Sequence, residues 1–264
     1  MFFFLASMPK CYNKMFSDEA MLKHNSLFVV IPALNEEHNV GPTVETVRAA
    51  VQNYFAEVTI AVFNDGSSDR TGEMAEELAR KFDNVRAIHH DKPKGLGYVY
   101  KAGIKLSDCE YVILVPGDNE GLQESLATIF GYAGKTDIVI PHTSNPEVRP
   151  LSRQIISKLF VMVLNALFGL RLKYYNGCVL HKTEIINSID IRTDSFAYQA
   201  EALIKLIKQG YRYVEVGAPI QERPSGGSKA FRWRNIVTVS TTILDLVWEI
   251  YFTSKPRAEK VNAR

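Results

Sequence analysis

The sequence is poor in cysteine and carries little net charge. Its 264 residues include only three cysteines, Cys11, Cys109 and Cys178, and the formal net charge is +2. The odd number and wide spacing of the cysteines provide neither a disulfide framework nor the ligand spacing of a zinc site. The small net charge gives no electrostatic reason to expect a nucleic-acid partner. These absences favour a reduced, cytoplasmic protein that binds no nucleic acid.

Two further features are missing near the start of the sequence. Residues 1–8 read MFFFLASM, which is shorter than the about 20 apolar residues that span a bilayer. No basic stretch precedes them, as it would in a secretory signal, and we expect residues 1–24 to form a loose tail. No Gly-x-Gly-x-x-Gly follows the first expected strand, which disfavours a dinucleotide-dependent oxidoreductase.

Short apolar runs alternate with helical patterns from residue 27 onward. Strands are expected at 27–31, 58–63, 85–88, 111–115, 137–140 and 211–216, and helices at 40–53, 71–81, 97–106, 122–132, 151–168 and 198–209. Continuous apolar strands separated by helices predict an α/β fold whose mostly parallel sheet is covered on both faces. In such sheets ligands bind at the carboxyl ends of the strands.

Polar loops follow the first four expected strands, at the edge where ligands are expected. They read PALNEE at 32–37, NDGSSDRT at 64–71, KGLG at 94–97 and PGDNE at 116–120. Each loop alone is typical of a turn or a helix cap, but their joint occurrence after successive strands favours a binding site. Carboxylates such as Glu36 and Asp65 can accept hydrogen bonds from the base and ribose of a nucleotide.

The fourth loop, at 116–120, also supplies candidate metal ligands. Asp118 and Glu120 are two residues apart, so their side chains point the same way if the segment is extended. A departing nucleoside diphosphate develops negative charge that a cation can stabilise. Mg²⁺ and Mn²⁺ prefer oxygen ligands, often one or two carboxylates with phosphates and waters. The loop therefore predicts a site for Mg²⁺ or Mn²⁺ at Asp118 and Glu120.

Taken together, these motifs resemble those of family-2 glycosyltransferases with the GT-A fold. The resemblance covers residues 27–252 and is closest to the polyprenyl-phosphate sugar synthases, the branch that includes dolichyl-phosphate mannose synthases. Its motifs are VIPALNEE at 30–37, NDGSSD at 64–69 with Thr71, KGLG at 94–97, RPLSR at 149–153 with Ser157, Asn176-Gly177, and RPSGGSK at 223–229. It implies a Rossmann-like, nucleotide-sugar-binding GT-A domain over residues 25–230, followed by a C-terminal amphipathic helix and tail over 231–264.

The resemblance also implies roles for individual residues. Asp118 and Arg153 are the expected catalytic residues, and Asp118 and Glu120 the expected metal ligands. The expected substrate-binding residues are Pro32, Ala33, Leu34, Glu36, Asp65, Lys94, Gly95, Gly117, Arg149, Ser157, Arg223, Ser228 and Lys229. One position departs from the family pattern, because Pro116 replaces the first aspartate of the metal-binding Asp-x-Asp. The loss of that carboxylate is expected to weaken or alter the dependence on metal.

The resemblance further implies an inverting transfer from a GDP- or UDP-sugar to a polyprenyl or dolichyl phosphate. A hydroxyl acceptor usually needs a general base, whereas a phosphate is already an anion. The acidic pair that often begins the helix at 198–209 in hydroxyl-specific relatives is missing here, which favours a phosphate acceptor. Two alternatives remain: a hydroxyl acceptor with Glu201 or Asp194 as base, and an inactive nucleotide-sugar-binding subunit.

The segment 236–252 predicts contact with a membrane surface. Its polar residues Thr238, Thr242, Asp245 and Glu249 share one face of a helix, while the other faces are apolar. Such a helix can lie in a membrane interface, and the apolar helix at 155–168 can add a second contact. We expect a peripheral protein at the cytoplasmic face, without a transmembrane span. The alternative is an ordinary amphipathic helix that packs on the domain.

Overall fold

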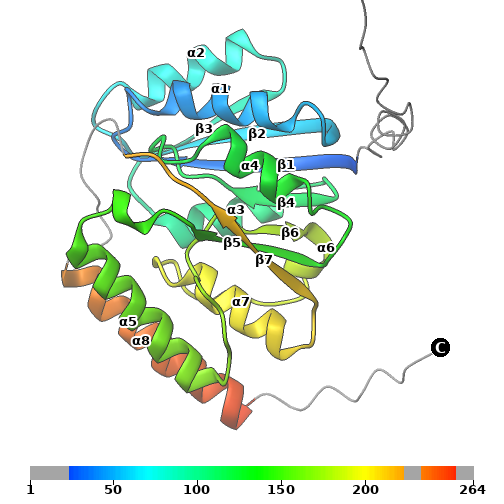
Figure 1. Cartoon of the computed structure of the whole chain (residues 1–264). Coiled ribbons are helices and arrows are strands. Elements are labelled where there is room, and N and C mark those ends of the chain that lie inside the picture. The colour runs from blue at the N-terminus through cyan, green and yellow to red at the C-terminus, as the bar shows by residue number, and fades with distance from the viewer. Residues whose placement is uncertain (1–23, 223–232, 254–264) are drawn as a thin grey trace, which may run out of the picture.

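A seven-stranded sheet organises the chain in the computed structural model, which describes residues 24–222 and 233–253 (Figure 1). The strand order is β3-β2-β1-β4-β6-β5-β7. The strands are β1 (His24–Ala33), β2 (Phe55–Asp65), β3 (Val85–His90), β4 (Tyr111–Leu114), β5 (Ile138–Thr143), β6 (Leu180–Lys182) and β7 (Tyr213–Ala218). All neighbours pair in parallel except β6, which runs antiparallel to both β4 and β5. The mostly parallel sheet expected from the apolar runs is confirmed.

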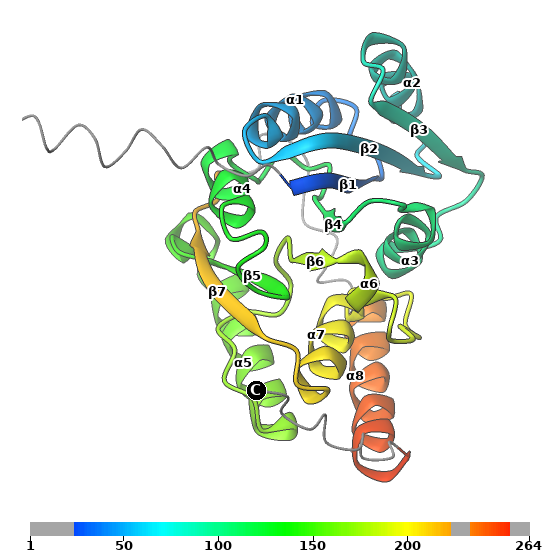
Figure 2. The same cartoon turned by 90° about the vertical axis from the view of Figure 1, so that its right-hand side faces the viewer.

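Helices cover both faces of this sheet, as Figures 1 and 2 show. The helices are α1 (Val40–Val51), α2 (Thr71–Lys81), α3 (Leu96–Leu106), α4 (Gln123–Phe130), α5 (Leu151–Phe168), α6 (Thr183–Ile186), α7 (Tyr198–Lys208) and α8 (Trp233–Trp248), with short turns η1 (Pro146–Val148) and η2 (Glu249–Thr253). One apolar core joins the sheet to α1, α2 and α4, and the other joins it to α3, α5, α7 and α8. The single α/β domain with a C-terminal helix is therefore confirmed.

Two details differ from the sequence expectations. The strand β6 was not predicted, because three residues between a loop and a short helix show no periodicity. His24 opens β1, so it belongs to the sheet and not to the expected tail. The rest of that tail lies outside the described residues, as does the segment from 254 to the C-terminus.

The core contains one histidine whose burial has a measurable consequence. His181 lies on β6 with no exposed surface, and burial lowers the pKa of its imidazole from 6.5 to about 3. The neutral ring receives the Gln199 amide, whose nitrogen lies 3.1 Å from Nε2. The unfolded chain therefore binds a proton near pH 6.5 that the folded chain does not bind.

We expect this histidine to make the fold sensitive to acid. Its contribution is fully present above pH 6.5 and is lost as the pH falls towards about 3, by about 1.4 kcal/mol per pH unit. Urea unfolding between pH 7 and 4.5 should show this slope, and His181→Leu should flatten it. The exposed His38 provides the control His38→Gln, which should keep the slope. An equally steep slope in His181→Leu would assign the acid sensitivity to other groups.

Candidate active site

The first two polar loops are fastened together at the carboxyl edge of the sheet. The Asn35 backbone N–H donates to Ser67 Oγ at 3.0 Å, and Asn35 Oδ1 accepts the Ser68 backbone N–H at 2.9 Å. The Glu36 N–H donates to Thr71 Oγ1 at 2.8 Å, and Asp69 accepts from both the Thr71 N–H and its hydroxyl. Asp69 thus binds the first residue of α2, whose N-cap residue, Arg70, makes no side-chain capping hydrogen bond. Glu36 itself is buried and accepts from the Asn39 side chain.

Asp65 shapes the third loop from the end of β2. It is 5% exposed, and its two carboxylate oxygens accept the Lys94 and Gly95 backbone N–H groups, each at 2.9 Å. His90 Nδ1 lies 2.8 Å from the same carboxylate. Gly95 has a φ of 100°, which a residue with a Cβ rarely adopts. Asp65 therefore holds the Lys94–Gly95 backbone in place beside the strand ends.

The fourth loop begins by extending β4 alongside β1. The Val115 N–H donates to the Val30 carbonyl at 2.9 Å, and the Gly117 N–H donates to the Pro32 carbonyl at 3.0 Å. The nitrogen of Pro116 lies between these two donors and faces away from β1, so this pairing loses nothing through the missing N–H. A Cβ on Gly117 would lie 3.0 Å from the Pro32 oxygen. Proline and glycine thus fit the places where the sequence puts them.

The chain turns sharply after Gly117, contrary to the extended geometry considered for Asp118 and Glu120. Asn119 has a φ of 56°, and the Glu120 N–H folds back to Asp118 Oδ1 at 3.3 Å. Asparagine tolerates this left-handed conformation better than most residues. The Gln221 N–H donates to the Glu120 carbonyl at 3.0 Å, and the Gln221 side chain donates to the Asn119 carbonyl at 2.7 Å. The loop is therefore fixed by the strand-end segment that follows β7.

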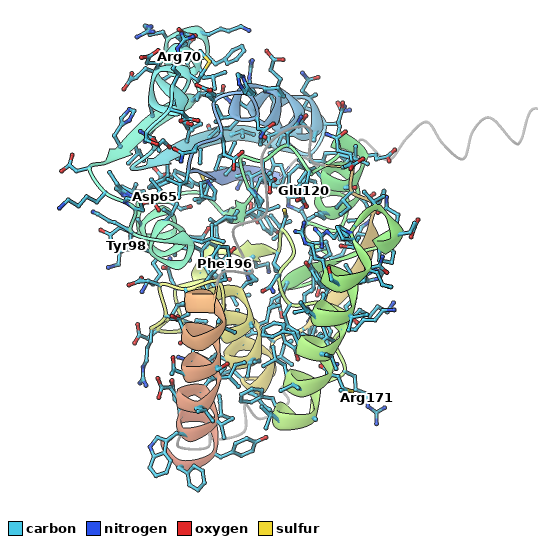
Figure 3. All side chains as sticks on the ribbon, turned by 90° about the vertical axis from the view of Figure 1, so that its left-hand side faces the viewer. Asp65, Arg70, Tyr98, Glu120, Arg171 and Phe196 are labelled. Atoms are coloured by element: carbon cyan, nitrogen blue, oxygen red, sulfur yellow. The ribbon has the colours of Figure 1, made fainter. Side chains whose placement is uncertain are left out.

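The Glu120 side chain is held by two arginines, one just before α5 and one in its first turn. Its Oε2 lies 3.0 Å from Arg149 Nη2, and its Oε1 lies 3.2 Å from Arg153 Nη1. The other Arg149 terminal nitrogen donates to the Tyr174 hydroxyl at 3.1 Å. Figure 3 looks onto this edge of the sheet, with Glu120 and Asp65 both labelled. The arginines expected to bind phosphate and the acid expected to bind metal thus occupy one cluster.

The donor set at this edge suits a hard cation only in part. No group of three or more His, Cys, Asp or Glu side chains within residues 24–222 and 233–253 is arranged to hold a metal. Asp118 and Glu120 supply carboxylate oxygens, which fit Mg²⁺ or Mn²⁺ where phosphates and waters complete the coordination. Each Glu120 oxygen already accepts from an arginine, so a metal would compete with these two ion pairs for the carboxylate. Cys178 is no alternative ligand, because burial and the adjacent Asp118 raise the pKa of its thiol to about 12.

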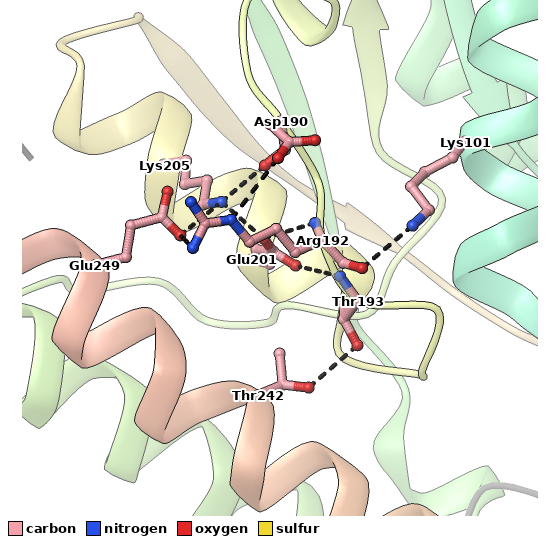
Figure 4. A network of polar contacts seen from close by, with 8 residues as sticks. All are labelled: Lys101, Asp190, Arg192, Thr193, Glu201, Lys205, Thr242 and Glu249. Carbon is pink, nitrogen blue, oxygen red and sulfur yellow. Dashed lines mark hydrogen bonds and ion pairs between the residues drawn. The ribbon is translucent and has the colours of Figure 1, made fainter. Parts of the chain in front are cut away.

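The two acids considered as a general base are engaged elsewhere, and Figure 4 shows the contacts of one of them, Glu201. Glu201 is 3% exposed, and its oxygens accept the Arg192 and Thr193 N–H groups and the Lys205 ammonium. Asp194 pairs with Lys101 at 2.8 Å, and its carbonyl accepts the Gly97 N–H. Glu201 therefore fixes the 192–194 loop against the start of α3 and is not placed to deprotonate an acceptor.

The other expected site residues divide into two groups. Pro32, Ala33 and Leu34 lie at the end of β1, and Lys94 is exposed with its ammonium 4.6 Å from the Tyr98 ring centre. Ser157 lies one helical turn beyond Arg153 on α5. The other group comprises Arg223, Ser228 and Lys229, which are outside the described residues. Reasoning from sequence missed Tyr174 and His90, because neither residue belongs to a recognisable motif.

The comparisons with known proteins identify the class to which this fold and site belong. The family model described as glycosyl transferase family 2 matches residues 28–190, and the chain belongs to this family of glycosyltransferases. Two curated relatives of this chain carry names that refer to polyprenyl phosphates and mannose. The undecaprenyl-phosphate mannosyltransferase of Micrococcus luteus is 28% identical over 77% of this chain and 86% of its own. The polyprenol monophosphomannose synthase of Mycolicibacterium smegmatis is 30% identical over 76% of this chain and 79% of its own.

Solved structures confirm the fold. Glucosyl-3-phosphoglycerate synthase from Mycobacterium tuberculosis, in complex with phosphoglyceric acid, aligns with 84% of this chain and 80% of its own at a TM-score of 0.66 and 16% identity. The same enzyme in complex with Mn²⁺, UDP-glucose and phosphoglyceric acid aligns with a TM-score of 0.62 and 15% identity, over 85% of this chain and 79% of its own. At these identities the likeness concerns the fold alone, and the expected GT-A architecture is confirmed.

Proposed function

We propose that this glycosyltransferase moves a sugar from a GDP- or UDP-sugar to a polyprenyl phosphate, with inversion at the anomeric carbon. The observation that carries the proposal is the pair Arg149 and Arg153, which meets the Asp118–Glu120 loop at the carboxyl edge of the sheet. Arginine binds phosphate through paired hydrogen bonds. The names of the curated relatives support the same acceptor class.

In this reaction a phosphate oxygen of the lipid attacks the anomeric carbon opposite the leaving group. The new carbon–oxygen bond forms as the bond to the nucleoside diphosphate breaks, and the leaving diphosphate takes the electron pair. The attacking oxygen carries no proton at neutral pH, so no base is needed. This agrees with the hydrogen bonds that occupy Glu201. Arg149 and Arg153 would orient the acceptor phosphate, and positioning of this kind lowers the barrier.

The donor end of the site would use the loops around Asp65 and Asp118. Asp118 and Glu120 would hold Mg²⁺ or Mn²⁺, which supplies charge stabilisation for the departing diphosphate. The Lys94–Gly95 backbone, fixed by Asp65, lies beside the strand ends where the nucleotide would bind. Pro32, Ala33, Leu34, Glu36 and Gly117 would line the pocket from β1 and β4.

The product distinguishes this function from transfer to a hydroxyl. Purified protein would be incubated with radiolabelled GDP-mannose or UDP-glucose, Mn²⁺, and either a polyprenyl phosphate or the corresponding polyprenol. We expect a labelled lipid only with the phosphate, and we expect mild acid to release the sugar from it. A product with the polyprenol, or one that survives mild acid, would identify a hydroxyl acceptor. Nucleotide binding without any product would identify an inactive binding subunit.

We also propose that the protein lies at the cytoplasmic face of a membrane, and its exposed apolar residues support the membrane contact. On α5 these residues are Leu151, Ile155, Ile156, Leu159, Met162, Val163 and Leu167, and near the chain's end they are Leu244, Trp248, Tyr251 and Phe252. Figures 1 and 2 place α5 and α8 on the side of the molecule away from α1 and α2. Large exposed apolar patches mark sites of contact with proteins or membranes.

The helix α8 packs on the domain through Leu246 and the partly buried Ile243 and Val247, while Leu244 and Trp248 stay exposed. Part of its polar face, continued by Glu249 in η2, also contacts the protein. Thr242 contacts Thr193 at 3.1 Å, and Glu249 lies 3.2 Å from Arg192 and 3.0 Å from Lys205. The ends of α5 and α8 are joined where the Tyr251 hydroxyl donates to the Leu167 carbonyl at 2.7 Å. Among the described helices, α5 is long and apolar enough to cross a membrane. It has 18 residues and a mean hydropathy of 1.4, and 11% of it is buried. We favour a peripheral position in which exposed apolar residues of both helices contact the membrane.

Charging these residues should detach the protein from vesicles. Leu159 and Trp248 are 50% and 62% exposed, and burying such side chains in an interface is favourable by about 1.5–3 kcal/mol each. We expect Leu159→Asp with Trp248→Asp to lower the vesicle partition coefficient at least about tenfold, measured by co-sedimentation. The control Tyr132→Asp charges a side chain that is 38% exposed just beyond the end of α4. This variant should partition onto vesicles like the unmodified protein. Equal partitioning of both variants would place the membrane contact elsewhere.

A further inference from the structure

The two arginines of the site are already occupied by an anion, the Glu120 carboxylate. Each of its oxygens takes a different guanidinium, at 3.0 and 3.2 Å. The side chains of Glu120, Arg149 and Arg153 are only 13%, 15% and 26% exposed. A carboxylate and a phosphate present similar oxygen acceptors to arginine. Glu120 therefore lies where an incoming phosphate would find its strongest donors.

The surroundings of Arg149 are built for more acceptors than Glu120 alone provides. One of its terminal nitrogens contacts Glu120 and the other donates to the Tyr174 hydroxyl. Its Nε is buried and has no hydrogen-bond partner among the described residues. A buried donor without a partner is costly, and a phosphate with several acceptor oxygens could satisfy it. Arg149, Arg153 and Tyr174 together form what we call the anion cradle.

Glu120 is also one of the two carboxylates available to a divalent cation. Pro116 supplies no side-chain ligand, so Asp118 would hold the cation alone while Glu120 stays with the arginines. A cation that recruits Glu120 competes with the arginines of the anion cradle for the same carboxylate. A phosphate that enters the anion cradle competes with Glu120 for the same guanidinium groups. Both ligands would thus favour the same displacement of one side chain.

We propose that Glu120 closes the anion cradle in the unliganded enzyme, and that the acceptor phosphate and the divalent cation with its nucleoside diphosphate therefore promote each other's binding. The proposal rests on the proposed function, which supplies both ligands. It assigns Tyr174 to the phosphate site, and it gives Glu120 two alternating partners. Coupling between two ligands is reciprocal, because each must change the affinity of the other by the same factor.

Equilibrium binding tests this without turnover. The probe is a water-soluble monophosphate of a two-unit isoprenyl alcohol, titrated calorimetrically with and without saturating Mn²⁺ and nucleoside diphosphate. In the unmodified protein we expect Mn²⁺ together with the nucleoside diphosphate, called the Mn²⁺ complex below, to lower the Kd of the probe about tenfold. This is within the usual range of such coupling. In Glu120→Gln we expect the probe to bind about tenfold tighter without metal, and the Mn²⁺ complex to change its Kd less than twofold.

Two further variants complete the design. Glu124→Gln removes an exposed acid on the neighbouring α4 and should behave as the unmodified protein. Tyr174→Phe, made in the Glu120→Gln background, should weaken the probe severalfold, because the cradle loses one polar partner while the ring remains. If Tyr174→Phe leaves the Kd of the probe unchanged, Tyr174 is not part of the anion cradle.

The outcomes also separate this proposal from the function on which it rests. Probe and nucleotide that both bind without coupling would overturn the Glu120 mechanism and leave the proposed function intact. Competition between the probe and the nucleotide would show that the anion cradle binds the diphosphate of the donor. This result would also overturn the Glu120 mechanism. Unchanged probe affinity in Glu120→Gln would show that Glu120 does not close the cradle. Failure of the unmodified protein to bind either ligand would overturn both proposals.

Discussion

Asp118→Asn is expected to lower kcat/KM by about 10²–10³-fold, the usual effect of removing one group that stabilises charge in the transition state. The substitution keeps the size of the side chain and its ability to accept from the Glu120 N–H. It removes the carboxylate that would hold the cation while Glu120 is with the arginines. Because Pro116 supplies no second aspartate, the loop has little to compensate for this loss. Initial rates with the nucleotide sugar and polyprenyl phosphate at saturating Mn²⁺ would measure the effect.

A matched control separates loss of charge at the site from loss of charge in general. Asp83→Asn removes an exposed carboxylate at the turn before β3 and should retain full kcat/KM. The unfolding midpoints of both variants should match that of the unmodified protein. If Asp118→Asn kept full turnover with a saturating donor, the loop after β4 would not be the centre of the reaction.

Lys205→Met is expected to destabilise the fold by about 3–5 kcal/mol, the usual cost of removing one partner from a buried ion pair. The Lys205 side chain is 6% exposed and lies 2.7 Å from Glu201 and 3.0 Å from Glu249. Its ammonium also donates to the Asp190 carbonyl at 2.7 Å. Methionine fills much of the space but leaves two carboxylates facing each other. Urea denaturation at pH 7 would give the change in unfolding free energy.

The same helix provides the control for this experiment. Lys208→Met replaces an exposed lysine one turn further along α7, and surface substitutions usually change stability by less than about 0.5 kcal/mol. Adding Glu201→Gln to Lys205→Met should recover part of the loss, since one unpaired charge disappears. A loss below about 1 kcal/mol in Lys205→Met would mean that the network in Figure 4 does not hold α7 to η2.

The elements of this protein could be predicted from sequence wherever the chain is periodic. The apolar run 27–31 lies inside β1, and the pattern at 151–168 coincides with α5. The polar loops that follow the parallel strands lie close together because such strands bring their carboxyl ends to one edge of the sheet. This rule needs no coordinates. The three-residue β6 carries no such pattern and depends on the pairing surfaces that β4 and β5 offer.

The partners of the polar side chains could be predicted much less well. Glu120 and Arg153 are 33 residues apart, and Glu120 and Arg149 are 29 apart, so their pairing depends on how α5 returns past the sheet. Glu201 looked like a candidate base because it is the one acid on its helix, yet it is buried among backbone donors. The polar stripe at 238–249 was recognised, but sequence could not show that its last member, Glu249, contacts Arg192 and Lys205.

The sequence by itself determined the class of fold and the edge of the sheet where polar loops gather. Local periodicity and turn residues are properties of neighbouring positions, and they survive without knowledge of the rest of the chain. The tertiary structure alone decided that Glu120 lies against Arg149 and Arg153, and which apolar residues of α5 and α8 stay exposed while others join the core. Charge pairing and exposure are properties of surfaces assembled from distant segments, and only packing brings those segments together.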